Sequence, residues 1–184
     1  MEGDVYEPDP DLVAAARAGE LRAFEEIVRG YQADVWRLCF HVLHDETLSD
    51  DVTQDVFLRL YRFLPSFRLD SKFSTWVLSI ARNSAVDELR RLGRRRRLAE
   101  RIEAHTIPRA LDETVRVEIR EAVAELPIEL REPLVLIDMF GLPYRETARV
   151  IRAPVGTIKS RVHRARELLA QRLAAKPEED AGES

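Results

Sequence analysis

Helical periodicity constrains this chain more than any other feature of its sequence. Between residues 20 and 44, apolar side chains recur every three or four positions, which places them on one face of a long amphipathic helix. Similar spacing predicts further helices over residues 48–63, 73–92, 114–125, 128–140, 143–151 and 155–174. The alternating pattern of a half-buried strand is nearly absent. The sequence therefore predicts an all-α fold.

Breaks in the periodicity divide the chain into two small helical domains. The first is expected over residues 1–93 and the second over residues 112–175. Gly93 is followed by four consecutive arginines and little sustained periodicity, so residues 94–111 are predicted to form a flexible linker. Residues 176–184 form an acidic tail. A length of 184 residues suits two small domains.

Composition excludes several classes of protein. Hydrophobic residues make up 45% of the chain, which is enough for packed cores and excludes wholesale disorder. No apolar run reaches the length of about 18 residues that a membrane span needs, and the acidic start does not resemble a signal peptide. We therefore expect a soluble, cytoplasmic chain without membrane insertion. The single cysteine, Cys39, excludes an internal disulfide, and its place on an apolar face predicts a buried, inert thiol.

No pattern of catalytic residues is present. The chain lacks a phosphate-binding glycine-rich loop, an HExxH pair and a nucleophile elbow. His41 and His44 lack a third ligand at metal spacing. We therefore expect no enzyme activity, metal, cofactor or small-molecule substrate.

Charge alternates along the chain, although the net charge is only −4. Residues 1–72 and 111–151 carry net charges of −7 and −4, whereas residues 73–110 and 152–175 each carry +5. A protein that contacts both a polyanion and a basic partner needs such a layout. Two solvated basic helices would give the same pattern, so charge alone leaves both interpretations open.

Residues 143–161 carry the strongest local signal, a short helix, a tight turn and a longer helix. Small Ala148 lies where two helices must approach closely, and Ile158 anchors the second helix. This is a helix-turn-helix pattern. Arg152 occupies the turn position that glycine often holds, which leaves the geometry of the turn open.

The second helix of this motif has two different faces. Ile158, Val162, Ala165 and Leu169 are spaced four, three and four residues apart and are expected to be buried. The other face carries Lys159, Ser160, His163 and Arg164, with Arg161 and Arg166 at its flanks. Such side chains can donate to base edges and phosphates in a major groove. An ordinary helical hairpin with a basic exposed face is the alternative.

The first domain carries a second signal. Asp51, Gln54 and Asp55 lie on one helical stripe beside apolar residues, an arrangement that suits docking onto a basic partner helix. Phe67, Phe73 and Trp76 surround a loop, and the helix that follows carries Arg82, Asn83, Arg90 and Arg91. Aromatic rings beside such groups are typical of single-stranded DNA binding. Core packing is the alternative for Phe73 and the favoured role for Trp76.

Taken in order, these motifs identify a family. They are Asp51-Val52-Thr53-Gln54-Asp55-Val56-Phe57, Phe73-Ser74-Thr75-Trp76, Ile80-Ala81-Arg82-Asn83, Asp87, Arg90-Arg91, Tyr144-Arg145-Glu146 and Val155-Gly156-Thr157-Ile158-Lys159-Ser160-Arg161. Over roughly residues 10–175 the chain resembles bacterial RNA polymerase sigma factors of the extracytoplasmic-function (ECF) subfamily of the sigma-70 family. That subfamily keeps only the region-2 and region-4 domains. Thr147, where the family usually has an aliphatic residue, and Lys72 depart from the family pattern.

The resemblance implies a role for each motif. Core polymerase would be the partner, through its β′ clamp helices and its β subunit, and Asp51, Gln54 and Asp55 would bind the β′ clamp helices. Promoter DNA at the minus-10 element would be bound by Phe67, Arg68, Leu69, Asp70, Ser71, Lys72, Arg82, Asn83, Arg90 and Arg91. The minus-35 element would be bound by Thr157, Lys159, Ser160, Arg161, His163, Arg164 and Arg166. An anti-sigma factor, often membrane-bound, would hold the chain inactive.

Two other functions stay open at this point. A stand-alone helix-turn-helix regulator would need a ligand-binding or phosphoacceptor domain, and residues 1–93 show no α/β pattern for one. A pure interaction protein would have no need of the basic face around Arg164. Association with core RNA polymerase separates all three.

Overall fold

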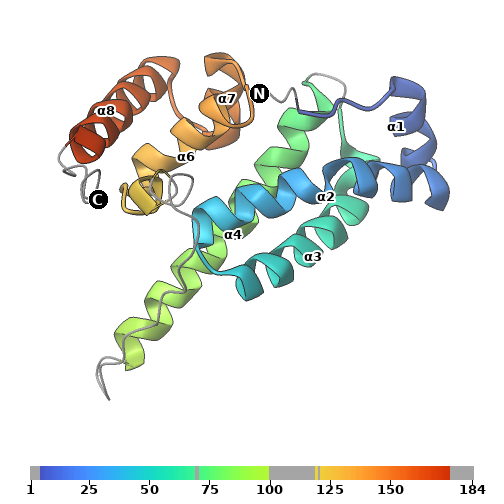
Figure 1. Ribbon diagram of the computed structural model, residues 1–184. Helices are drawn as coiled ribbons and strands as arrows, with labels where there is room; N and C mark the ends of the chain where they lie inside the picture. The colour runs from blue at the N-terminus through green and yellow to red at the C-terminus, as the bar shows by residue number, and fades with distance from the viewer. Residues whose placement is uncertain (1–4, 69–70, 100–118, 120, 175–184) are drawn as a thin grey trace, which may run out of the picture.

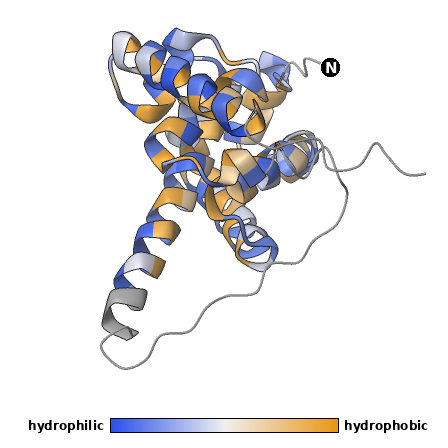
Figure 2. Cartoon of the chain, turned by 60° about the vertical axis from the view of Figure 1, so that its left-hand side comes forward, coloured by the Kyte–Doolittle hydropathy of each residue, from blue (hydrophilic) through white to orange (hydrophobic). Residues whose placement is uncertain are grey.

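The computed structural model describes residues 5–68, 71–99, 119 and 121–174, and these residues form no strand. The elements follow the order α1 (Pro10–Arg17), α2 (Leu21–Leu43), α3 (Glu46–Phe63), a 3-10 turn η1 (Leu64–Ser66), α4 (Phe73–Ala99), α6 (Ile128–Asp138), α7 (Tyr144–Ile151) and α8 (Val155–Ala174). The expected all-α fold with two helical domains is confirmed. The helices carry hydrophobic and hydrophilic residues on different sides (Figure 2). None of the described helices is both long enough and apolar enough to cross a bilayer.

The first domain packs α1, α3 and α4 around α2 (Figure 1). Ile27, Tyr31 and Val35 of α2 are fully buried, as the spacing of the apolar residues predicted. Local capping sets the helix starts: the carboxylates of Asp9 and Asp45 accept backbone hydrogen bonds in the first turns of α1 and α3.

The thiol of Cys39 is buried in this core, as predicted. Burial raises its pKa to about 12, because a thiolate would lose its hydration there. A group with this pKa holds almost no thiolate near neutral pH, which makes Cys39 a packing residue.

Helix α4 differs from the prediction. Gly93 was expected to end it, but the helix continues to Ala99 and so includes the start of the predicted linker. Gly93 is not among the residues with positive φ, and a helical glycine costs only about 1 kcal/mol relative to alanine. The arginines that follow are good helix formers, so one glycine does not stop the helix. The C-terminal part of α4 projects beyond both groups of helices (Figure 1). The rest of the linker, from residue 100, and the acidic tail lie outside the described residues.

The apolar spacing of the helix predicted over residues 48–63 placed both Phe63 and Leu64 inward. Leu64 is 1% exposed, as predicted, but Phe63 is 54% exposed. The chain changes from α3 to the 3-10 turn between these two residues. The change of helix type rotates successive side chains by a different angle, which periodicity alone does not anticipate.

The second domain packs α6 and α7 against α8. Leu136, Val150 and Ile158 are fully buried and form its centre. Thr147 is also buried, and its hydroxyl donates to the carbonyl oxygens of Pro143 (3.2 Å) and Leu142 (3.5 Å). These bonds satisfy the polar group that stands where the family usually has an aliphatic residue.

The two domains contact each other, which the sequence did not predict. Helix α7 packs against α4, and α6 packs against α2. In Figure 1, α6, α7 and α8 lie together on one side of α4.

Arg152 makes the helix-turn-helix turn in a left-handed conformation, with φ of 58°. Its N–H and that of Ala153 donate to the carbonyl oxygens of Arg149 and Ala148 and so close α7. A left-handed backbone costs a residue with a Cβ about 1–2 kcal/mol. Arginine therefore holds the turn, with local strain that glycine would lack.

We predict that Arg152→Gly stabilises the second domain by about 0.5–1 kcal/mol, because relief of strain exceeds the extra freedom glycine gives the unfolded chain. The measurement is the free energy of unfolding in urea. Arg149→Gly, at an exposed position inside α7, is the matched control and should destabilise by about 1 kcal/mol. A lower stability for Arg152→Gly would contradict the assignment of strain to this turn.

Candidate nucleic-acid interface

Helix α8 separates its two faces as the sequence predicted. Ile158, Val162 and Ala165 are at most 1% exposed and pack into the second domain, whereas Leu169, predicted to be buried with them, is only partly buried. The predicted DNA-reading residues lie on the other side: Lys159, Ser160, His163, Arg164 and Arg166 are exposed, and Thr157 and Arg161 are partly exposed. The helix therefore carries a polar, mostly basic ridge on its outward side.

Carboxylates contact three of these side chains, Arg166, Arg164 and His163. The guanidinium of Arg166 makes a bidentate pair with Asp138 of α6 at 2.6 and 3.2 Å, and these hydrogen bonds raise the pKa of Arg166. Glu167 lies 3.4 Å from both Arg164 and His163. The pair with Asp138 links Arg166 to α6 and fixes its direction, whereas the Glu167 contacts are exposed and easily exchanged for phosphate or base contacts.

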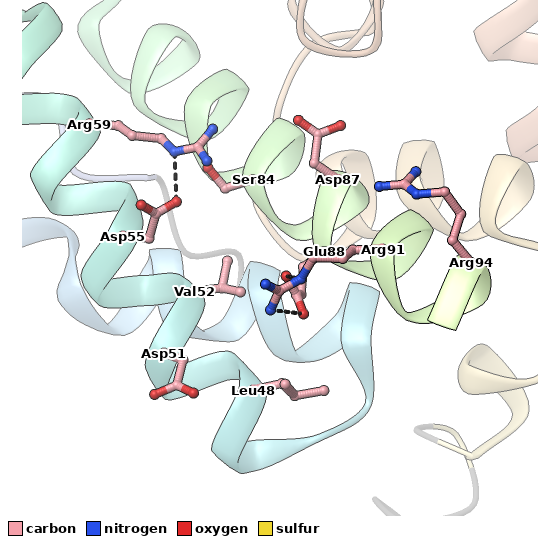
Figure 3. Close-up of a pocket in the computed structure, with 10 residues that line it drawn as sticks. All are labelled: Leu48, Asp51, Val52, Asp55, Arg59, Ser84, Asp87, Glu88, Arg91 and Arg94. Carbon is pink, nitrogen blue, oxygen red and sulfur yellow. Dashed lines mark hydrogen bonds and ion pairs between the residues drawn. The ribbon is translucent and has the colours of Figure 1, made fainter. Parts of the chain in front are cut away.

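The acidic stripe of the first domain lies on α3, with Asp51 and Gln54 exposed and Asp55 partly exposed. Asp51 and Asp55 line a groove of about 570 Å³ between α3 and α4, where Asp55 pairs with Arg59 at 2.6 Å (Figure 3). Gln54 instead lines a second groove, of about 580 Å³, between α3 and α2. The three predicted polymerase-binding residues thus form a ridge with a groove on each side.

The two charged grooves differ in composition. The α4 wall of the first groove carries the ion pair of Glu88 with Arg91 (2.7 Å) near Asp87 and Arg94 (Figure 3). The second groove contains Trp36, whose indole N–H donates to Asp50 at 2.7 Å.

The predicted minus-10 loop is anchored by an aromatic cluster. Phe67 is 3% exposed, with ring centroids 5.1 Å from Phe73 and 4.9 Å from Trp76. Its ring therefore packs inside the domain and is not on the surface where a base could stack. Trp76 also packs in the cluster, as favoured above. Arg68 and Lys72 are exposed and Ser71 is partly exposed, whereas Leu69 and Asp70 lie outside the described residues.

The second domain covers part of the predicted minus-10 surface. Arg82 forms a bidentate ion pair with Glu132 of α6 at 2.7 and 3.1 Å, and the two side chains are 16% and 5% exposed. Asn83 accepts a hydrogen bond from the same guanidinium at 3.1 Å. Arg90 and Arg91 lie farther along α4, are exposed, and pair with Asp87 and Glu88. Arg82 is thus occupied, while Arg90 and Arg91 are open to solvent.

Glu146 of α7 makes a parallel contact. Its carboxylate accepts a hydrogen bond from the Thr75 hydroxyl at 2.7 Å and lies 3.8 Å from the Lys72 ammonium. Carboxylates of the second domain therefore engage two of the cations predicted to bind promoter DNA, Lys72 and Arg82.

Arg131 adds a third link between the domains. Its guanidinium donates to the carbonyl oxygens of Ala124 and Leu126 at 2.5 and 2.7 Å, and to those of His41 and Val42, both at 3.4 Å. The last two carbonyls belong to the final turn of α2, the negative end of that helix. Burial lowers the pKa of Arg131, a shift that the adjacent Glu132 opposes.

Sequence reasoning gave no role to Arg131 and Glu132, and it named Glu146 only as part of a family motif. The available signal was the position of Arg131 and Glu132 directly before the apolar run 133–137, because buried charges need partners. Nothing local indicated that the partners would come from the other domain.

Comparison with known proteins agrees with this architecture. A family model of sigma-70 region 2 matches residues 27–95, and a model of sigma-70 region 4 matches residues 116–169. The first match covers α3 and most of α2 and α4. The second includes the helix-turn-helix.

Relatives match over most of the chain. RNA polymerase sigma-H factor of Pseudomonas aeruginosa is 35% identical over 91% of this chain and 94% of its own length. ECF RNA polymerase sigma factor SigC of Mycobacterium tuberculosis is 37% identical over 86% of this chain and 87% of its own. ECF RNA polymerase sigma-E factor of Escherichia coli is 33% identical over 90% and 94%.

Solved structures share the fold. CnrH, in a complex with the cytosolic domain of CnrY, aligns with a TM-score of 0.71 and 26% identity over 91% of this chain and 97% of that one. The sigma factor RpoE of Bartonella quintana, in a complex with the anti-sigma factor NepR, aligns with a TM-score of 0.74 and 22% identity over 85% and 100%. Because both regions match in order, and because the relatives above are 33–37% identical over most of the chain, the chain belongs to the ECF subfamily of the sigma-70 family of RNA polymerase sigma factors.

Proposed function

We propose that this sigma factor binds core RNA polymerase through the ridge of Asp51, Gln54 and Asp55 and directs initiation at promoters read by both of its domains. The observation that carries the proposal is the helix-turn-helix, in which Ile158 and Val162 are buried while Lys159 and Arg164 face outward. A polar ridge on a helix anchored in this way fits a major groove. The chain then acts as an initiation factor, without a reaction of its own, in the cytoplasm where the polymerase works.

Each domain takes one promoter element. Helix α8 reads the minus-35 element with Lys159, Ser160, His163 and Arg164, while Thr157, Arg161 and Arg166 contact phosphates. The first domain binds the minus-10 element with the loop residues 67–72 and with α4. The buried ring of Phe67 gives that residue the role of anchoring the loop, so the exposed Arg68 and Lys72 make its contacts.

The contact between the domains must open before the minus-10 element binds. Glu132 and Glu146 occupy Arg82 and Lys72, and DNA phosphates would compete for the same cations. The two carboxylates therefore act as internal substitutes for the nucleic acid. Binding of the polymerase to an open form would shift the population away from the closed one.

An anti-sigma factor would favour the closed form. Of the two structural relatives, RpoE is bound to the anti-sigma factor NepR, and CnrH is bound to the cytosolic domain of CnrY. We propose the same type of control here, because a partner that bound both domains at once would also hold their mutual contact together.

The proposal is tested by transcription with bacterial core enzyme on a DNA library with randomised minus-35 and minus-10 elements. We expect transcripts to start downstream of one enriched pair of elements, and only when this protein is added. Specific binding to duplex DNA with no transcription would instead favour a stand-alone regulator.

We predict that Asp51→Arg together with Asp55→Arg lowers affinity for core enzyme at least tenfold, because it reverses the charge of the ridge. Asp51 is exposed and Asp55 is partly exposed, so the free energy of unfolding should change by about 0.5 kcal/mol or less. Glu125→Arg with Glu129→Arg is the matched control, since it makes the same charge change four residues apart at exposed positions of the second domain. Equal affinities for core enzyme in a folded double variant and wild type would remove the ridge from the interface.

Arg164→Ala should relax recognition of the minus-35 element. A base-reading pair contributes about 1–3 kcal/mol of discrimination, so substitutions at one base position should cease to matter. Initiation is compared on the enriched promoter and on its single-base variants. A phosphate contact would behave differently, weakening initiation on every promoter by the same factor.

We predict that Glu132→Ala opens the domain contact. It leaves the Arg82 guanidinium buried without its partner, a condition that costs about 3–5 kcal/mol and is relieved when the domains separate. Small-angle scattering should show a larger radius of gyration than for wild type. Glu129→Ala, at an exposed position of the same helix, should leave the radius unchanged. An unchanged radius in both variants would show that Arg82 and Glu132 do not control the contact.

A further inference from the structure

We propose that Glu7 is a positioning residue for promoter opening: it fixes the first turn of α4, the turn to which the minus-10 loop connects. The carboxylate of Glu7 accepts hydrogen bonds from the backbone N–H groups of Phe73 (2.7 Å) and Ser74 (3.1 Å). These donors have no partner within their own helix, because the first N–H groups of a helix never do. The residue that provides the cap therefore lies 66 positions earlier in the chain.

The segment that carries Glu7 is itself held in place. The hydroxyl of Tyr31 donates to the carbonyl oxygen of Tyr6 at 2.6 Å, and the two rings meet edge to face at 5.3 Å. Pro8 is buried. A Cβ on Gly30 would lie 2.4 Å from the Tyr6 ring, so only glycine lets Tyr6 come this close to α2. Residues 5–8 thus form a strap from α2 to the start of α4.

The strap meets the minus-10 loop at its second end. Phe73 directly follows Lys72, the last residue of that loop, and its ring packs against Phe67 at the first end. The ring of Tyr31 lies 5.9 Å from Phe73, so strap, loop ends and α4 share one aromatic cluster. Aromatic packing fixes how deeply the Phe73 ring is buried. The two hydrogen bonds that the N–H groups of Phe73 and Ser74 donate to Glu7 fix the direction of the backbone.

Fixing this turn in advance lowers the cost of capturing an unpaired base. A loop that joins a frayed helix end must be ordered when DNA binds, and this entropy is taken from the binding free energy. A negative charge at the positive end of α4 adds to the hydrogen bonds that prevent fraying. This role rests on the proposed function, since it assumes that residues 67–72 contact the minus-10 element.

The experiment compares Glu7→Ala with wild type in the full chain bound to core enzyme. We expect initiation on the enriched duplex promoter to fall about twofold to thirtyfold, which is the range for loss of a helix cap. Initiation on the same promoter with a pre-melted minus-10 element should stay within about twofold, and affinity for core enzyme should not change. Glu7→Gln keeps the length of the side chain and one acceptor oxygen, so it should restore part of the loss.

Asp9→Ala is the matched control. Asp9 lies in the same part of the chain, but its carboxylate caps α1, accepting the N–H of Asp11 at 2.8 Å, and not α4. It should leave the ratio of duplex to pre-melted initiation at the wild-type value. The positioning role would be overturned if Glu7→Ala lowered initiation equally on both templates, or if Asp9→Ala changed the ratio as much as Glu7→Ala does. Either result would indicate only a general loss of stability.

Amide hydrogen exchange of the free protein separates this inference from the proposed function. Glu7→Ala should speed exchange at Phe73 and Ser74, whereas Asp9→Ala should not. Unchanged exchange at these two amides would show that Glu7 does not order the turn, whatever the polymerase assay gives. A wild-type protein that does not initiate transcription at all would refute the sigma-factor proposal, while the exchange result would still decide whether Glu7 orders the turn.

Discussion

The buried ion pair of Arg82 with Glu132 links the two domains of this protein. It joins α4 to α6, with both side chains largely removed from solvent. Two charges taken out of water lose hydration free energy, and their mutual attraction does little more than offset that loss. Such a pair therefore adds little net stability as a whole. Losing only one partner is costly, because the other charge then stays buried and unpaired. An interface built on this pair is therefore destabilised when one partner is removed, but it opens at small cost when both charges return to water together.

The same physics explains how residues with a proposed DNA-binding role can lie in a covered surface. A guanidinium that makes a bidentate contact with a carboxylate has the geometry for a bidentate contact with a phosphate. Under the proposed function, Arg82 would exchange Glu132 for nucleic acid without changing its own direction. The exposed pairs of Arg90 and Arg91 would exchange still more easily, because solvent already screens them. The cations of α4 thus form a series, from exposed to covered, along one helix.

Much of this architecture was predictable because it depends on local rules. The periodicity over residues 20–44 and 155–174 correctly predicted α2 and α8, and the small Ala148 marked the close approach in the helix-turn-helix. Errors arose where competing local preferences are similar in energy. Gly93 does not end α4, because its helix penalty is small beside the propensity of the arginines that follow. Phe63 is exposed because a 3-10 turn begins at the next residue and gives the core position to Leu64.

The sequence by itself determined the helices, the family and the outward face of α8, since each follows from neighbours within about four positions or from the order of motifs along the chain. Only the tertiary structure decided which side chains are accessible. It placed Phe67 in a core, put Gln54 in a different groove from Asp51, and brought Glu7 to the start of α4 and Glu132 to Arg82. These contacts join residues that are 50 or more positions apart in the last two cases. A local pattern carries no information about such pairs, because their energies depend on the burial and direction that the packed helices create.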